Sequence, residues 1–275
     1  MHLRVMTQCN ISCRNSNGRR DTAVAITEFT LIALLGLASG LMIGCIGIGG
    51  VILVPALVFL ADLPIKICIS AAMAAFILSG LVATAVFASH KSIHWGMAIW
   101  LCIGAAPAAF AGAWAVSLAN PRVLEAGLGL LTFGSGLNSL RRYDEIHASG
   151  INLSNKVLLP IGAVTGLLSS LSGTGGPLVL VPILISMSVP VLTAVGLSQA
   201  VQLPVAIAAT FGNVLYGKLD LVLGSILAAT LTIGSWYGAR LAHVVPRAIL
   251  RRIVSATLVV IGAFILGNVG WRLLG

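Results

Sequence analysis

The sequence predicts an all-α, polytopic membrane protein with about eight transmembrane helices, arranged as two homologous repeats of four spans. Hydrophobic residues make up 58% of the 275 residues and charged residues 8%, whereas soluble domains carry roughly 25% charged residues. Apolar runs recur in two similar sets, and each set contains one glycine motif, Gly47-Ile48-Gly49-Gly50 or Gly173-Thr174-Gly175-Gly176. These observations exclude a soluble protein and predict one broken helix in each repeat.

The apolar runs give the predicted helices in order. In the first half they cover residues 23–45, 51–61, 65–89, 95–119 and 123–140, and in the second half 157–171, 177–189, 191–216, 221–242 and 249–270. A membrane span needs about 20 apolar residues. The runs at 51–61 and 177–189 are shorter, so each is predicted to be a half-helix that completes the span interrupted by its glycine motif.

The flanking segments complete the predicted organisation. Residues 1–22 form a polar, basic leader, 23–140 the first repeat, 141–156 a connecting loop and 157–275 the second repeat. The run after the leader exceeds the 7–15 apolar residues of a secretory signal, so it is expected to remain as a span. The leader is interpreted as disordered, or as the result of a start codon placed too early. Cysteine spacing, including Cys9 and Cys13, predicts no disulfide framework, metal site or cofactor.

The formal net charge of +9 is distributed as in a membrane protein. The 16 Lys and Arg residues lie at the ends of apolar runs and form no patch with interleaved aromatics, which excludes nucleic acid as a partner. The lipid bilayer of the cytoplasmic membrane is the expected partner. Loop charges favour a cytoplasmic N-terminus, although Arg240, Arg247, Arg251 and Arg252 cluster on the side that this orientation places outside.

The two halves match at many positions at an offset of 126, while Pro55 matches Pro182 and Ser70 matches Ser198 only after shifts of one or two residues. Gly40 falls on Gly166, Gly112 falls on Gly238, and the glycines of the first motif fall on those of the second. An even number of spans per half predicts parallel repeats, and an odd number predicts inverted repeats. A chance match within apolar, glycine-rich sequence is the alternative interpretation.

The two glycine motifs are the strongest candidates for a functional site. Glycine destabilises helices and Pro177 suits a first turn, so each motif is predicted to end one helix and start the next. Corresponding breaks in two halves of a membrane protein indicate a transporter's binding site. The first turn of a helix exposes unpaired N–H groups, so residues 49–51 and 175–178 would each cradle an anion. The alternative is close helix packing, which is favoured for Gly36, Gly40 and Gly44.

Polar residues inside the apolar runs are the next candidates, because each needs a partner in hydrocarbon. Gln199 and Gln202 share a helix face, where they line the predicted path or bond to a neighbouring helix. Arg240 lies near the end of an apolar run, where it either meets the anion or reaches the interface. The full set of predicted substrate-binding residues is Gly47, Gly49, Gly50, Val51, Ser70, Ser172, Gly173, Thr174, Gly175, Gly176, Ser198, Gln199, Gln202 and Arg240.

The glycine motifs also resemble those of a known family. Three segments are similar to the TauE/SafE family of sulfite exporters, namely Gly47-Ile48-Gly49-Gly50-Val51 running to Pro55, Ser172-Gly173-Thr174-Gly175-Gly176-Pro177 running to Pro182, and Gly238-Ala239-Arg240-Leu241. The similarity covers about residues 26–270, and Val51 stands where the family has a third glycine. This resemblance implies a permease of about eight spans that moves small sulfur-containing or organic anions outward.

The sequence therefore predicts a membrane permease that exports a small anion, sulfite or a related sulfur-containing or organic anion, by a carrier mechanism. Hinged half-helices suit alternating access, and no ring of charges marks a channel. A coupling ion (proton or sodium) and the oligomeric state stay open. An intramembrane enzyme is excluded because there is no Gly-x-Ser-Gly motif, and His90, His94 and His243 lie at loops. A membrane assembly or scaffold protein is the remaining alternative.

Overall fold

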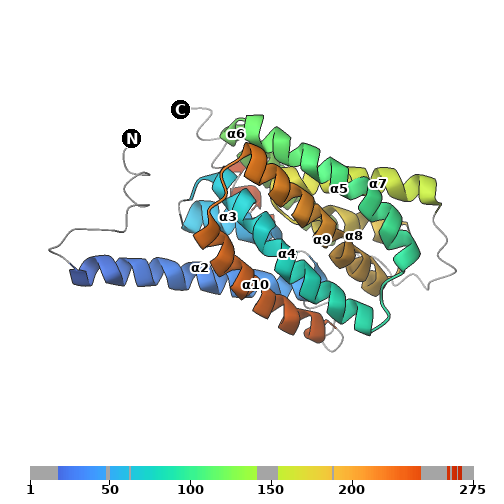
Figure 1. Cartoon of the computed structure of the whole chain (residues 1–275), viewed down its shortest axis with the longest axis horizontal. Helices are drawn as coiled ribbons and strands as arrows, with labels where there is room; N and C mark the ends of the chain where they lie inside the picture. The colour runs from blue at the N-terminus through green and yellow to red at the C-terminus, as the bar shows by residue number, and fades with distance from the viewer. Residues whose placement is uncertain are drawn as a thin grey trace.

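The computed structural model describes residues 18–47, 50–61, 63–140, 154–187 and 189–242, together with residues 259–260, 262–264 and 266–267. The helices named in these residues (Figure 1) are α2 (Gly18–Ile46), α3 (Gly50–Leu60), α4 (Ile65–Ser89), α5 (Trp95–Leu118), α6 (Pro121–Leu140), α7 (Asn155–Ser172), α8 (Pro177–Ser186), α9 (Val191–Tyr216) and α10 (Leu221–Leu241). Gly49, residues 1–17 of the leader and most of the predicted run 249–270 lie outside the described residues. For the described residues, the prediction of an all-α protein is confirmed.

Proline and a capping carboxylate set several helix boundaries. α4 and α9 begin directly after Pro64 and Pro190, whose extended backbone has ψ of 129° and 140°, at the residues predicted from the sequence. α10 begins after Asp220, whose Oδ1 accepts hydrogen bonds of 3.0 Å from the N–H groups of Val222 and Leu223. These bonds satisfy two of the donors that the first turn of a helix leaves unpaired.

Two boundaries differ from the prediction by three residues or more, and the other boundaries of the described helices lie within two residues of it. α2 begins at Gly18, within the segment predicted as leader, because charged residues there continue the helix beyond the apolar run. α8 ends at Ser186, before the predicted end at residue 189. At that point the N–H of Met187 donates to the carbonyl oxygens of Ile183 and Leu184, at 3.2 and 3.1 Å, which tightens the last turn and ends the helix.

Four of the described helices, α4, α5, α9 and α10, are long and apolar enough to cross a membrane. α2 adds a shorter apolar stretch, Phe29–Cys45, and α3 is a short apolar helix. Large apolar side chains are exposed along the helices, including Leu78, Ile99, Phe211 and Ile233. Helix surfaces of this kind face lipid. The chain is therefore a multi-pass membrane protein.

The two halves of the chain interlock. α4 of the first half packs on α9 of the second half, while α2 packs along α10 and α7 packs along α5 (Figure 1). α10 also packs on α4, and α5 also packs on α9. The first helix of each half therefore has its main partner in the other half, so neither half completes its packing alone.

Glycines make the close contacts between the halves. A β-carbon on Gly40 of α2 would lie 2.8 Å from the Cα of Leu231 in α10, and one on Gly166 of α7 would lie 2.8 Å from the Cα of Ala105 in α5. The same offset of 126 positions relates the members of both contacts. Gly36 and Gly44 of α2 also face α10, which confirms the interpretation that Gly36, Gly40 and Gly44 serve close helix packing.

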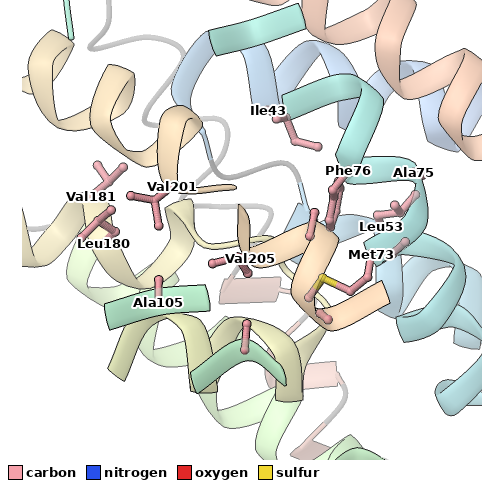
Figure 2. Packing of buried hydrophobic residues seen from close by; sticks show 14 of the residues in the cluster. Ile43, Leu53, Met73, Ala75, Phe76, Ala105, Leu180, Val181, Val201 and Val205 are labelled. Carbon is pink, nitrogen blue, oxygen red and sulfur yellow. The ribbon is translucent and has the colours of Figure 1, made fainter. Parts of the chain in front are cut away.

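The buried core surrounds the two half-helices, α3 and α8. Figure 2 shows Phe76 of α4 near Leu53 of α3, and Leu180 of α8 near Val201 of α9. All four side chains are fully buried. The half-helices are thus enclosed by protein, as a broken membrane helix requires, because lipid offers no hydrogen-bond partners to its free backbone groups.

Candidate functional site

The two glycine motifs meet in the interior of the protein. A β-carbon on Gly50, the first residue of α3, would lie 2.5 Å from the carbonyl oxygen of Thr174. A β-carbon on Gly47 would lie 2.9 Å from Cβ of Pro177 and 3.3 Å from Oγ of Ser198. Glycine allows this close approach because it has no side chain. The structure thus brings both motifs and Ser198 of α9 to one place.

Left-handed backbone shapes the second motif. Gly173 caps α7 with φ of 69° and ψ of 24°, and its N–H donates to the carbonyl oxygen of Ser169. Gly175 and Gly176 follow with φ of 79° and 111°. Residues with side chains rarely adopt such φ values, which explains why glycine occupies all three positions.

The turn that opens α8 presents free hydrogen-bond donors. Val179 and Leu180 both donate to the carbonyl oxygen of Gly176, at 3.3 and 3.2 Å. Among the described residues, the N–H groups of Gly176 and Leu178 have no hydrogen-bond acceptor, and Pro177 has no N–H. Unpaired N–H groups at the start of a helix carry a partial positive charge and bind anions. The start of α8 is therefore suited to negative charge.

Two glutamines of α9 present unpaired oxygens near the motifs. Gln199 is fully buried, and its amide nitrogen donates to the carbonyl oxygen of Ile43 at 2.9 Å. Gln202 is 1% exposed, and its amide nitrogen donates to Oγ of Ser79 at 3.5 Å. Within the described part of the chain, the Oε1 atoms of both glutamines have no partner. A buried polar atom without a partner is costly, so these oxygens indicate a place that a ligand or water fills.

Sequence reasoning missed Ser169 of α7. Its side chain is 0% exposed, and its Oγ has no partner in the described residues. This oxygen lies 3.9 Å from the position that a β-carbon on Gly176 would take. The signal that could have identified Ser169 is the offset of 126 positions, which places Ile43 at the equivalent position of the first half. Ser169 therefore joins the candidate site.

Other predicted residues have partners of their own or lie within the core. The hydroxyls of Ser172 and Thr174 lie 2.8 Å apart and bond to each other. Ser70 donates to the carbonyl oxygen of Lys66, in its own helix, at 2.8 Å. Val51 is fully buried in α3. These side chains help to hold the backbone of the site in place.

Arg240 lies on the outer surface of α10. Its guanidinium carbon is 3.9 Å from the centroid of the Trp236 ring, and its side chain is exposed. Trp236 precedes Arg240 by about one helical turn, so the two side chains form a cation–π pair on the same face of the helix. An exposed side chain that stacks on Trp236 fits the interface alternative, and contact of Arg240 with the anion stays a prediction.

We expect the substitution Arg240→Gln to change anion transport by less than about twofold, because an exposed charge away from the site is screened by solvent and salt. The measurement is anion flux per folded protein molecule in liposomes. Arg240→Lys serves as the matched control, since it keeps the charge. A loss of about tenfold in the Gln variant, restored in part by Lys, would place Arg240 on the anion path instead.

Comparison with known proteins identifies relatives over most of the chain. A family model described as Sulfite exporter TauE/SafE matches residues 32–265. The chain is 24% identical to the probable membrane transporter protein YunE of Bacillus subtilis (strain 168), over 90% of this chain and 97% of that protein. It is 25% identical to the probable membrane transporter protein YdhB of the same organism, over 86% and 99% of the two chains. The probable membrane transporter protein MJ0441 of Methanocaldococcus jannaschii is also 25% identical, over 86% and 94%. No solved structure matches.

Proposed function

The chain belongs to the sulfite exporter TauE/SafE family and is a membrane transporter, and from this we propose that it exports a small anion across the cytoplasmic membrane. The proposed substrate is sulfite or a related sulfur-containing or organic anion. The proposed architecture is that of a carrier, with about eight spans in two homologous repeats and one glycine-broken helix in each.

The observation that carries this proposal is the meeting of the two glycine motifs at the buried start of α8. The free N–H groups of Gly176 and Leu178 can donate to an anion there. The buried polar side chains among the described residues are Ser, Thr, Gln and Asn, with no charged group among them. The partial positive charge at the start of the helix would repel a cation, and it would give little stabilisation to a neutral solute. An anion therefore fits the start of α8 best.

The interlocked halves support a carrier over a channel. Each half-helix packs on the long helix of its own half, α3 on α4 and α8 on α9. Its glycine motif, however, touches the other half, as Gly50 touches Thr174. A movement of one half relative to the other would therefore change the surroundings of the site. Alternating access in transporters with internal repeats uses movements of this kind.

Transport by the purified protein in liposomes tests the proposal. Liposomes that contain the protein and are loaded with sodium sulfite should release sulfite faster than protein-free liposomes, and the rate should saturate with sulfite concentration. Saturation distinguishes a carrier from an open pore. Sulfate and small carboxylates, measured in the same way, define the range of substrates. A protein that inserts and folds but moves no anion would contradict the proposal and favour the membrane scaffold.

A further inference from the structure

The two halves differ in polarity at equivalent positions around the glycine motifs. At the offset of 126 positions, apolar residues of the first half fall on polar residues of the second half at six positions: Ile43 and Ser169, Ile46 and Ser172, Ile48 and Thr174, Ala72 and Ser198, Met73 and Gln199, and Phe76 and Gln202. A β-carbon on Gly50 would meet Phe76, and one on Gly176 would have Gln202 among its nearest neighbours. The two contacts are thus related by the same offset, but the contacting side chain is aromatic in the first half and polar in the second half.

The unpaired polar atoms show the same asymmetry. The buried side-chain nitrogen and oxygen atoms without a partner in the described residues belong to Thr165, Ser169 and Ser170 of α7 and to Gln199, Gln202, Thr210 and Asn213 of α9. All of these residues lie in the second half of the chain. Unpaired polar atoms inside a membrane protein are costly, so their confinement to α7 and α9 indicates that the substrate is bound by the second half.

Phe76 closes the first glycine motif. Its Cζ atom would lie 3.0 Å from a β-carbon on Gly50, and its Cδ2 atom would lie 2.8 Å from one on Gly175. Phe76 is 0% exposed and packs within the core (Figure 2). The ring therefore occupies the space in front of both glycines and leaves no room there for an anion.

The space in front of Gly176 is open by comparison. The nearest atoms to a β-carbon on Gly176 would be the Cα of Gln202 and the Oγ of Ser169, each at 3.9 Å. This is ordinary van der Waals separation, in contrast to the close contacts at Gly50 and Gly175. The free N–H group of Gly176 and the unpaired hydroxyl of Ser169 therefore lie beside this space. The Cα of Gln202 borders the same space, and the Oε1 atom of its side chain has no partner among the described residues.

These groups provide donors and an acceptor. The N–H groups at the start of α8 and the Ser169 hydroxyl can donate to negatively charged oxygens. The Oε1 atom of Gln202 can only accept a hydrogen bond, so among oxyanions it can pair with an oxygen that bears a proton but not with a bare charged oxygen. One helix N-terminus supplies only about half a positive charge, and no charged side chain is buried among the described residues. A second negative charge on the ligand would therefore be left without compensation.

Resting on the transport function proposed above, we propose that the chain has a single substrate site, at the second glycine motif, and that this site takes an oxyanion in its singly charged, proton-bearing form. For sulfite this form is hydrogensulfite. Ser169 donates to a charged oxygen of the ligand, and Gln202 accepts the proton of its hydroxyl oxygen. The transported species then carries its proton with it.

The substitution Ser169→Ala tests the site itself, with Ser170→Ala as the matched control. Both hydroxyls are buried and unpaired, but Ser170 faces Gly112 of α5 instead of the second motif. The measurement is the rise in melting temperature of the purified protein with increasing sodium sulfite, in slightly acidic buffer. We expect Ser169→Ala to need about tenfold more sulfite for the same rise, because a hydrogen bond to a charged group is lost. Its melting temperature without sulfite should stay equal or increase, and Ser170→Ala should behave as the parent.

A pH series tests the charge of the ligand, because the second ionisation of sulfurous acid falls near neutral pH. The total sulfite concentration needed for half of the thermal shift should rise as pH increases. The concentration of hydrogensulfite present at that point should stay the same at every pH. Sulfate, which is doubly charged throughout, should produce no shift. Gln202→Leu should flatten the pH dependence, since it removes the acceptor for the ligand's proton.

Two results would overturn the inference while leaving the transport function in place. One is that the parent transports sulfite in liposomes, while sulfite raises the melting temperature of Ser169→Ala as much as that of the parent. The other is an affinity that follows the doubly charged form as pH rises. If liposomes show no flux of any anion, the proposed transport function fails, and the inference fails with it.

Discussion

Replacing Gly166 with alanine is expected to reduce the amount of folded protein in the membrane to a small fraction of that of the parent. The new β-carbon would overlap the carbonyl oxygen of Ala105 and lie 2.8 Å from its Cα. Both atoms belong to the backbone of α5, so no side chain can move aside to relieve the overlap. α7 must shift away from α5 along their main interface, and we expect a loss of about 3 kcal/mol or more in the free energy of unfolding.

Two further variants make this expectation specific. Gly40→Ala, at the equivalent position of the first half, should have a similar effect through the backbone of Leu231 in α10. Gly127→Ala in α6 is the control, because a β-carbon there has no atom within 4 Å, and alanine favours the helix by up to about 1 kcal/mol. The measurements are the yield of monodisperse protein and its melting temperature. Equal yields of the Gly166 and Gly127 variants would show that α5 and α7 do not pack as described.

The sequence predicts helix boundaries well where a residue marks them physically. Pro64 and Pro190 lack an N–H group and fix φ, so α4 and α9 start directly after them. Gly173 adopts a left-handed conformation, and α7 ends before it. The start of α2 at Gly18 has no such marker, and hydropathy does not detect a helix that continues through polar residues.

The partners of the helices could not be predicted from one sequence. The spacing of the glycines in α2 correctly identifies a packing face, because residues four apart share a side of a helix. It does not identify α10 as the partner, since Gly40 and Leu231 are far apart in the chain and nothing local connects them. The interlocking of the two halves is therefore known only from the structure.

The candidate site was predictable in position but not in detail. Both glycine motifs, Gln199 and Gln202 were identified from the sequence, because glycine breaks and amides are rare inside apolar runs. The contribution of Phe76 was not, since an aromatic residue in a membrane helix gives no sign of what it faces. Ser169 was also missed, although a comparison with Ile43 at the repeat offset would have identified it. Symmetry within the sequence predicts where two equivalent places lie, and we propose that the difference in polarity between them identifies the one that binds the anion.

The substitution Gly175→Ala is expected to damage both glycine motifs at once. Its β-carbon would lie 2.8 Å from Cδ2 of Phe76, and the ring of Phe76 also faces Gly50 at 3.0 Å. The overlap should cost about 1 to 3 kcal/mol. The φ of 79° at this position adds roughly 1 to 2 kcal/mol for a residue with a side chain. We expect the free energy of unfolding to fall by about 2 to 5 kcal/mol, and the stabilisation by anion to be lost, because the displaced ring disturbs the start of α8.

The double variant Gly175→Ala with Phe76→Leu separates these two causes. Leucine is shorter than phenylalanine, so it relieves the overlap with the new methyl group but leaves the strain of the left-handed backbone. In a double-mutant cycle we therefore expect the second substitution to restore about 1 kcal/mol or more relative to the sum of the single effects. Phe76→Leu alone supplies the reference, with a modest loss from its smaller buried side chain. Additive effects on the free energy of unfolding would mean that Gly175 does not face Phe76. The space in front of Gly175 would then be free for an anion, as the sequence first suggested.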